Sequence, residues 1–135
     1  MSGFHRIVFD TSTLVSAALR VGSTPHQALM QAIALGEVCV SQATLAELKQ
    51  VLSRSKFDLY QPQGVRRAFV DLVRELAVQV PVSASDEASV LHACRDAKDN
   101  PFLALVLACQ ADLLVLHPWR GVPILTPRAY LLQSA

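Results

Sequence analysis

The sequence predicts an α/β fold in which a parallel sheet is covered by helices on both faces. Short, wholly apolar runs are typical of buried parallel strands, and Ile7–Phe9 is the first of them. These runs alternate along the chain with segments of helical periodicity, which is the pattern of βαβ units. The 135 residues contain no repeat, low-complexity run or linker, so we expect a single domain over residues 1–135.

The first part of the chain predicts a strand, a helix, a second strand and a second helix. After the strand Arg6–Asp10, a helix opens at Thr24-Pro25, with threonine as its cap and proline in the first helical position, and it stops at Gly36. The second strand covers Glu37–Val40. Ser41 then caps a helix, whose apolar stripe contains Leu45, Leu48, Val51 and Leu52.

A polar segment over residues 53–63 separates this helix from the later elements. The next helix covers Val65–Ala77, with Phe69, Leu72, Val73 and Leu76 on its apolar side. A short strand covers Val78–Val82, and Pro81 favours a sheet edge or a strand end. The remaining expected elements are a short helix around Ala88–Cys94, a helix from Asn100-Pro101 through Cys109, strands at Leu113–Leu116 and Val122–Leu125, and a helical turn at Arg128–Leu132.

Composition restricts the class of protein. Apolar residues make up 52% of the chain and charged residues 17%, which excludes disorder. The net charge of +1 means that nucleic acid would have to be bound by a local patch of cations. An apolar excess on so short a chain also indicates a buried subunit interface, so we expect a homodimer. Candidate faces are the helix surfaces around Leu29–Leu35 and Val65–Leu76.

The sequence also predicts a cytoplasmic location. Three cysteines without CxxC spacing favour a reducing compartment over a disulfide or zinc framework. The N-terminus leads directly into a core strand and does not resemble a signal peptide. The most apolar stretch, Phe102–Leu116, has 15 residues, including Gln110 and Asp112, and is too short and too polar to span a membrane.

Four acidic residues are candidates for a site. Asp10 ends the first strand, and ligand sites in parallel sheets lie at the carboxyl ends of strands; the alternative is a helix cap. Glu47 lies at the border of an apolar stripe, where the alternative is a solvated glutamate. Asp96 and Asp99 precede a helix, whose first amides they would otherwise cap. Together such carboxylates suit Mg²⁺ or Mn²⁺, ions that activate water and stabilise charge on a phosphodiester.

Three segments, taken in order, resemble the PIN-domain family. They are Arg6-Ile-Val-Phe-Asp-Thr-Ser-Thr, Val40-Ser-Gln-Ala-Thr-Leu-Ala-Glu-Leu and Cys94-Arg-Asp-Ala-Lys-Asp-Asn-Pro. The similarity covers nearly the whole chain and is greatest to bacterial members that are toxin components of toxin–antitoxin systems. It implies a three-layer αβα sandwich around a mostly parallel sheet, and metal-dependent endoribonuclease activity.

By motif position, the resemblance assigns catalytic roles to Asp10, Glu47 and Asp99. The same three residues and Asp96 would hold Mg²⁺ or Mn²⁺, and Ser12 would hydrogen-bond within the site. RNA would be the substrate and an antitoxin protein the partner. The cations that could contact RNA, each of which could equally be an ordinary solvated charge, are Arg54, Lys56, Arg95 and Lys98.

One departure from the family pattern affects the expected activity. A further acidic segment of the Thr/Ser-Gly-Asp type is missing, because Ala111-Asp-Leu-Leu-Val-Leu-His-Pro-Trp runs directly into the last part of the chain. The fold is therefore expected to be shortened near its last two strands. A second hypothesis follows, in which the domain is catalytically impaired and binds a protein. A third, a phosphotransferase with Asp10 as nucleophile, has only the Asp-Thr-Ser-Thr motif in its favour.

Overall fold

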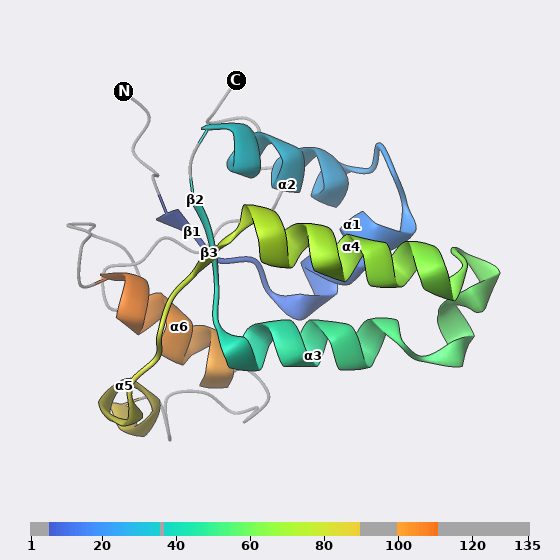
Figure 1. Ribbon diagram of the computed structural model, residues 1–135. Helices are drawn as coiled ribbons and strands as arrows, with labels where there is room; N and C mark the ends of the chain where they lie inside the picture. The colour runs from blue at the N-terminus through green and yellow to red at the C-terminus, as the bar shows by residue number, and fades with distance from the viewer. Residues whose placement is uncertain (1–5, 36, 90–99, 111–135) are drawn as a thin grey trace.

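The computed structural model describes residues 6–35, 37–89 and 100–110, and it has an α/β fold with a small parallel sheet (Figure 1). Strands β1 (Arg6–Ile7), β2 (Glu37–Val40) and β3 (Val78–Gln79) lie in the order β1-β2-β3. Both pairings are parallel, with Ile7 opposite Val38 and Cys39 opposite Val78. The expected class is confirmed. The expected shortening near the last two strands falls outside the described residues.

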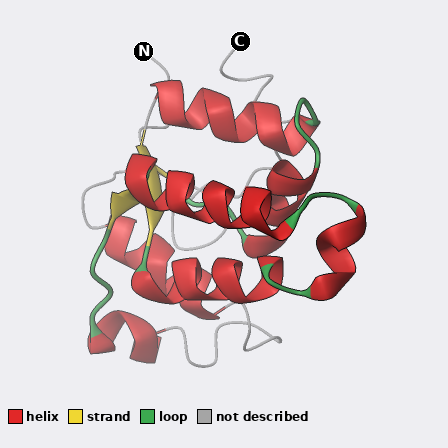
Figure 2. Ribbon diagram, turned by 45° about the vertical axis from the view of Figure 1, so that its right-hand side comes forward, coloured by secondary structure: helices red, strands yellow, loops and turns green. Residues whose placement is uncertain are grey.

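The central strand β2 supplies side chains to both faces of the sheet. Val38 and Val40 belong to the main core cluster, whereas Cys39 belongs to a second cluster with Leu105 and Cys109. This alternation is the two-residue period of a strand that is buried on both sides. Four helices therefore cover one face, namely α1 (Thr11–Leu19), α2 (Thr24–Leu35), α3 (Gln42–Leu52) and α4 (Gln63–Leu76). Helix α6 (Asn100–Gln110) covers the other face, as Figure 1 shows. Figure 2 shows how much of the described chain is helical.

The outer strands are shorter than the apolar runs predicted. Beyond the end of β1, Val8 packs on the second cluster and Phe9 on the main core, so the alternation continues without strand pairing. After β3, the backbone N–H of Val80 still donates to the carbonyl of Val40 at 2.8 Å. Pro81 has no N–H to continue the ladder, which agrees with the expected strand end.

Helices α1 (Thr11–Leu19) and α2 (Thr24–Leu35) follow β1. Asp10 caps α1. At α2 the expected cap is displaced by one residue. The side chain of Ser23 accepts from the backbone N–H of His26 at 3.4 Å, and Thr24 is the first helical residue. Ser23 can cap because its hydroxyl faces the free amides of the first turn.

Helix α3 (Gln42–Leu52) begins at the predicted cap. Ser41 and Thr44 are both buried and form a capping box, in which each side chain accepts from the backbone N–H of the other residue. A 3₁₀ helix, η1 (Ser55–Leu59), follows within the segment predicted to be polar, and α4 (Gln63–Leu76) packs against α3.

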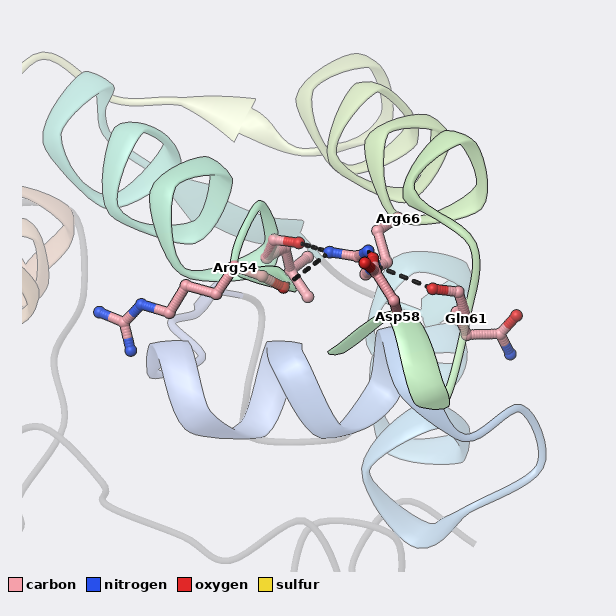
Figure 3. Close-up of polar contacts among 5 residues, drawn as sticks. Arg54, Asp58, Gln61 and Arg66 are labelled. Carbon is pink, nitrogen blue, oxygen red and sulfur yellow. Dashed lines mark hydrogen bonds and ion pairs between the residues drawn. The ribbon is translucent and has the colours of Figure 1, made fainter. Parts of the chain in front are cut away.

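Arg66 on α4 is buried, with 1% of its surface exposed. Its guanidinium donates to the carbonyls of Leu52, Arg54 and Gln61 and forms an ion pair with Asp58 (Figure 3). The expected apolar side of this helix is therefore correct only in part. Val73 is buried, but Leu72 and Leu76 are 41% and 48% exposed. The carbonyls at the end of α3 need donors, and the arginine supplies them from the inner face of α4.

The described chain ends with α5 and α6. Helix α5 (Ala84–Ser89) starts earlier than the short helix predicted around Ala88–Cys94. Residues 90–94 of that predicted helix lie outside the described residues. The strands and helical turn predicted after residue 110 also lie outside them. Within the described ranges, no helix has the length and apolar character needed to cross a membrane.

Candidate metal centre

Asp10 lies three residues beyond the carboxyl end of β1 and directly precedes α1. Its Oδ1 accepts from the backbone N–H of Thr13 at 2.9 Å, and its Oδ2 accepts from the hydroxyl of Ser12 at 3.3 Å. The carboxylate therefore caps the helix and remains exposed to solvent. The alternative assignment as a cap is confirmed, and it leaves oxygen lone pairs free for a further ligand.

Glu47 is brought to the same end of α1 from another part of the chain. The hydroxyl of Thr11 donates to Glu47 Oε2 at 2.8 Å, across 36 positions of sequence. Thr11 follows Asp10 directly, so the hydrogen bond places the Glu47 carboxylate beside the end of the first strand. Glu47 is half-buried, so its carboxylate is partly solvated and is also held by the hydroxyl of Thr11.

The packing of α3 against α1 explains why Glu47 faces this position. Leu45 and Leu48, on either side of Glu47, are buried in the core cluster that also contains Leu14 of α1. Glu47 lies at the edge of this buried stripe, as the periodicity predicts. The capping box at Ser41 fixes the start of α3, so its side chains have a defined rotation about the helix axis.

The two carboxylates have no positive partner in the described part of the chain. The ion pairs there join Arg66 to Asp58 and Arg74 to Asp71, and neither involves Asp10 or Glu47. The donor set consists of carboxylate and hydroxyl oxygens. Such a set fits Mg²⁺ or Mn²⁺, which prefer hard oxygen ligands and are often held by one or two carboxylates. Among the described residues, no three metal-ligating side chains form a group.

Several predicted site residues fall outside the described ranges: Arg95, Asp96, Lys98 and Asp99. The two other predicted cations are exposed near the end of α3. Arg66 holds the carbonyl of Arg54 at 3.1 Å, while the Arg54 guanidinium extends away from this cluster (Figure 3). Lys56 Nζ lies 5.1 Å from the centre of the Phe57 ring.

Thr11 is the site residue that the sequence did not indicate. A hydroxyl directly after a strand-end aspartate is visible in the Asp-Thr-Ser-Thr motif. Its acceptor, however, is Glu47, and the pairing of these two residues depends on how α1 packs on α3.

Comparison with protein-family models supports the assignment made from the motifs. The model described as PIN domain matches residues 6–117, which is most of the chain and includes Asp10, Glu47, Asp96 and Asp99. Comparison with curated proteins and with solved structures gave no significant match. The chain therefore belongs to the PIN domain family, and this membership suggests nuclease activity in general.

Proposed function

We propose that this protein is a metal-dependent endoribonuclease that hydrolyses RNA phosphodiesters. The observation that carries the proposal is the hydrogen bond from Thr11 to Glu47, since it brings a second acid to the strand end that bears Asp10. Among the described residues, the carboxylates of Asp10 and Glu47 have no positive partner. Two such carboxylates near the carboxyl end of a parallel strand form the kind of site at which a divalent cation is bound.

Each residue has a defined role in this proposal. Asp10, Glu47 and Asp99 are the catalytic acids, and together with Asp96 they hold Mg²⁺ or Mn²⁺. The bound ion would activate water and stabilise the charge that develops on the phosphodiester. Ser12 donates to Asp10 Oδ2 and fixes the rotation of that carboxylate, while the N–H of Thr13 holds the other oxygen.

RNA would be guided to the acids by local cations, because the chain has a net charge of only +1. Arg54 and Lys56 follow the C-terminal end of α3, the helix that carries Glu47. Arg95 and Lys98 flank Asp96 in the sequence. We assign all four to contacts with the phosphate backbone, which position RNA without reading its sequence.

The biological role that we propose is that of a cytoplasmic toxin neutralised by an antitoxin protein, with the toxin acting as a homodimer. Support comes from the motif resemblance and from the apolar composition. Between the two candidate dimer faces, burial favours α4. Leu29 and Ala32 of α2 are used in the core of the subunit, whereas Val65, Leu72 and Leu76 of α4 are exposed.

An alternative function is a protein-binding module without nuclease activity. The specific observation that favours it is the missing acidic segment between Ala111 and Trp119. With one acid fewer, the site would hold a cation less tightly. The fold would be retained, and so would the ability to bind an antitoxin-like partner.

RNA cleavage distinguishes these two functions. Purified protein is incubated with single-stranded RNA and Mn²⁺, and the proposal expects cleavage that stops when the metal is chelated. Asp10→Asn and Glu47→Gln remove one charge each with little change of shape, so we expect rates lower by about 10²-fold or more. Asp71→Asn and Glu75→Gln make the same changes on exposed residues of α4 and serve as matched controls.

Two results would contradict the nuclease proposal. One is the absence of cleavage at any protein concentration, which favours the binding module. The other is cleavage that Asp10→Asn and Glu47→Gln leave unchanged, which would point to a contaminating nuclease. The toxin role has its own test, since expression of the wild-type chain should stop bacterial growth and expression of Asp10→Asn should not.

A further inference from the structure

Thr11 makes a contact that the cap of α1 does not require. It is the first residue of the helix and half-buried, and its hydroxyl donates to Glu47 Oε2 at 2.8 Å. The cap itself is complete without this hydroxyl, because Asp10 accepts from Thr13 and Ser12. In the described part of the chain, Thr11 is the hydrogen-bond partner of the Glu47 carboxylate.

Glu47 needs such a partner if it is to hold a cation in a defined position. A glutamate side chain has three rotatable bonds, and fixing them costs conformational entropy. Its helix is well anchored: the capping box fixes one end of α3, and Leu48 is fully buried next to it. Three rotatable bonds separate the carboxyl group from the helix backbone, and one of its oxygens is held by the hydroxyl of Thr11.

We propose that Thr11 is a positioning residue for the second acid of the site. This inference rests on the proposed metal-dependent function and identifies the residue that orients Glu47 within it. Donation to Oε2 fixes the plane of the carboxylate, and Oε1 has no hydrogen bond in the described residues. Groups that orient a metal ligand in this way raise metal affinity or activity by roughly 10- to 100-fold.

A purely structural role for the hydroxyl makes a different prediction. If the hydrogen bond only tied α1 to α3, its loss would lower stability and leave cation affinity unchanged. The two roles are separated by measuring Mn²⁺ binding by calorimetry and thermal unfolding on the same proteins. Neither measurement depends on catalytic turnover.

Three variants form the test. Thr11→Val removes the hydroxyl with little change in volume, and Thr11→Ser keeps a hydroxyl. Thr24→Val is the matched control, because Thr24 is the first residue of α2 as Thr11 is of α1. We expect Thr11→Val to weaken Mn²⁺ binding about tenfold, and to lower kcat for RNA with little effect on KM. Thr11→Ser should restore most of the affinity, and Thr24→Val should behave as the wild type.

A double-variant comparison guards against indirect effects on folding. In a Glu47→Gln background, Thr11→Val should cause little further loss of Mn²⁺ affinity, because the residue acts through Glu47. Equal losses in both backgrounds would overturn the inference. So would a Thr11→Val protein that binds Mn²⁺ as tightly as a binding-competent wild type, and in that case the nuclease proposal would stand. A wild type that neither binds Mn²⁺ nor cleaves RNA would contradict both the role of Thr11 and the nuclease proposal.

Discussion

Asp10 caps α1, and we propose that the same carboxylate also binds the metal ion. Its oxygens accept hydrogen bonds from Thr13 and Ser12, and they remain exposed at the end of β1. Sequence alone left a cap and a catalytic acid as alternatives. The proposed catalytic role is compatible with the cap, because it would use other lone pairs of the same carboxylate. Substitutions can therefore separate them.

Asp10→Asn should keep the cap and lose the charge, whereas Asp10→Ala should lose both. Asparagine caps helices about as well as aspartate, so we expect its free energy of unfolding to stay within about 0.5 kcal/mol of the wild type. The alanine variant should lose about 1 kcal/mol. Urea denaturation followed by circular dichroism measures the free energy of unfolding of both variants. Equal destabilisation by the two substitutions would show that the charge of Asp10, and not its hydrogen bonds, stabilises α1.

How well the contacts of a single residue could be predicted depends on how far apart in the sequence the contacting residues are. Asp10 was a candidate because it ends the first predicted strand, and the resemblance implied a hydrogen bond from Ser12 within the same short motif; the structure has the Ser12 hydroxyl donating to Asp10, a local contact. Glu47 could be placed only at the border of a buried stripe. Its contact with Thr11 spans 36 positions and depends on tertiary packing, which the pattern of one helix does not contain. Asp96 and Asp99 lie outside the described residues and stay predictions.

At the scale of elements, caps and apolar stripes predicted most helices, but not which face of α4 is buried. The periodic apolar residues indicated a face containing Leu72 and Leu76, and both are partly exposed. Arg66 takes the inner position because the end of α3 presents carbonyl groups that require donors. A buried arginine looks like a surface residue in the sequence, since its acceptors are backbone atoms of another element.

Removing the guanidinium of Arg66 should destabilise the protein strongly. Arg66→Met keeps an unbranched apolar side chain but leaves the carbonyl of Leu52 without its buried donor. Hydrogen bonds from charged donors contribute about 1.5–3 kcal/mol each, so we expect a loss of at least about 2 kcal/mol in the free energy of unfolding. Arg67→Met is the matched control, because Arg67 is exposed on the same helix, and its effect should be below about 0.5 kcal/mol.

Chemical denaturation of the two arginine variants decides this point. If Arg66→Met and Arg67→Met lower the free energy of unfolding equally, the hydrogen bonds of Arg66 contribute no more to stability than a surface charge does. If only Arg66→Met is destabilised, the connection between α3 and α4, including η1, depends on this one side chain. The positions of Arg54 and Lys56 would then depend on it as well, because Arg66 contacts both the carbonyl of Arg54 and the side chain of Asp58.

At the scale of the molecule, the central strand β2 is buried on both sides, whereas both residues of the outer strand β3 are exposed. Val38 and Val40 face one core and Cys39 the other, as expected for a parallel sheet between helices. This arrangement was predictable, because a strand that is apolar on both faces needs helices packed on both faces to exclude water. The sequence did not predict which apolar residues of the covering helices lie in the core and which lie on the surface. Composition gives the number of apolar residues but not their positions in the fold.

The exposed side chains Val65, Leu72 and Leu76 of α4 are spaced by seven and four residues, so they lie along one face of the helix. In a symmetric dimer formed through this face, each residue would contribute twice, once from each copy. We therefore expect the wild type to have twice the chain mass in light scattering at micromolar concentration, and Leu72→Glu to have the mass of one chain. Burying an unpaired carboxylate twice is unfavourable enough to dissociate a modest interface.

Leu59→Glu provides the control for this test, because Leu59 is 90% exposed in η1 and lies off the α4 face. It adds the same charge and should leave the dimer intact. Dissociation by Leu59→Glu but not by Leu72→Glu would move the interface to η1. If the wild type has the mass of a single chain, the apolar face of α4 is not covered by a second copy. That face would then be expected to bind a different partner.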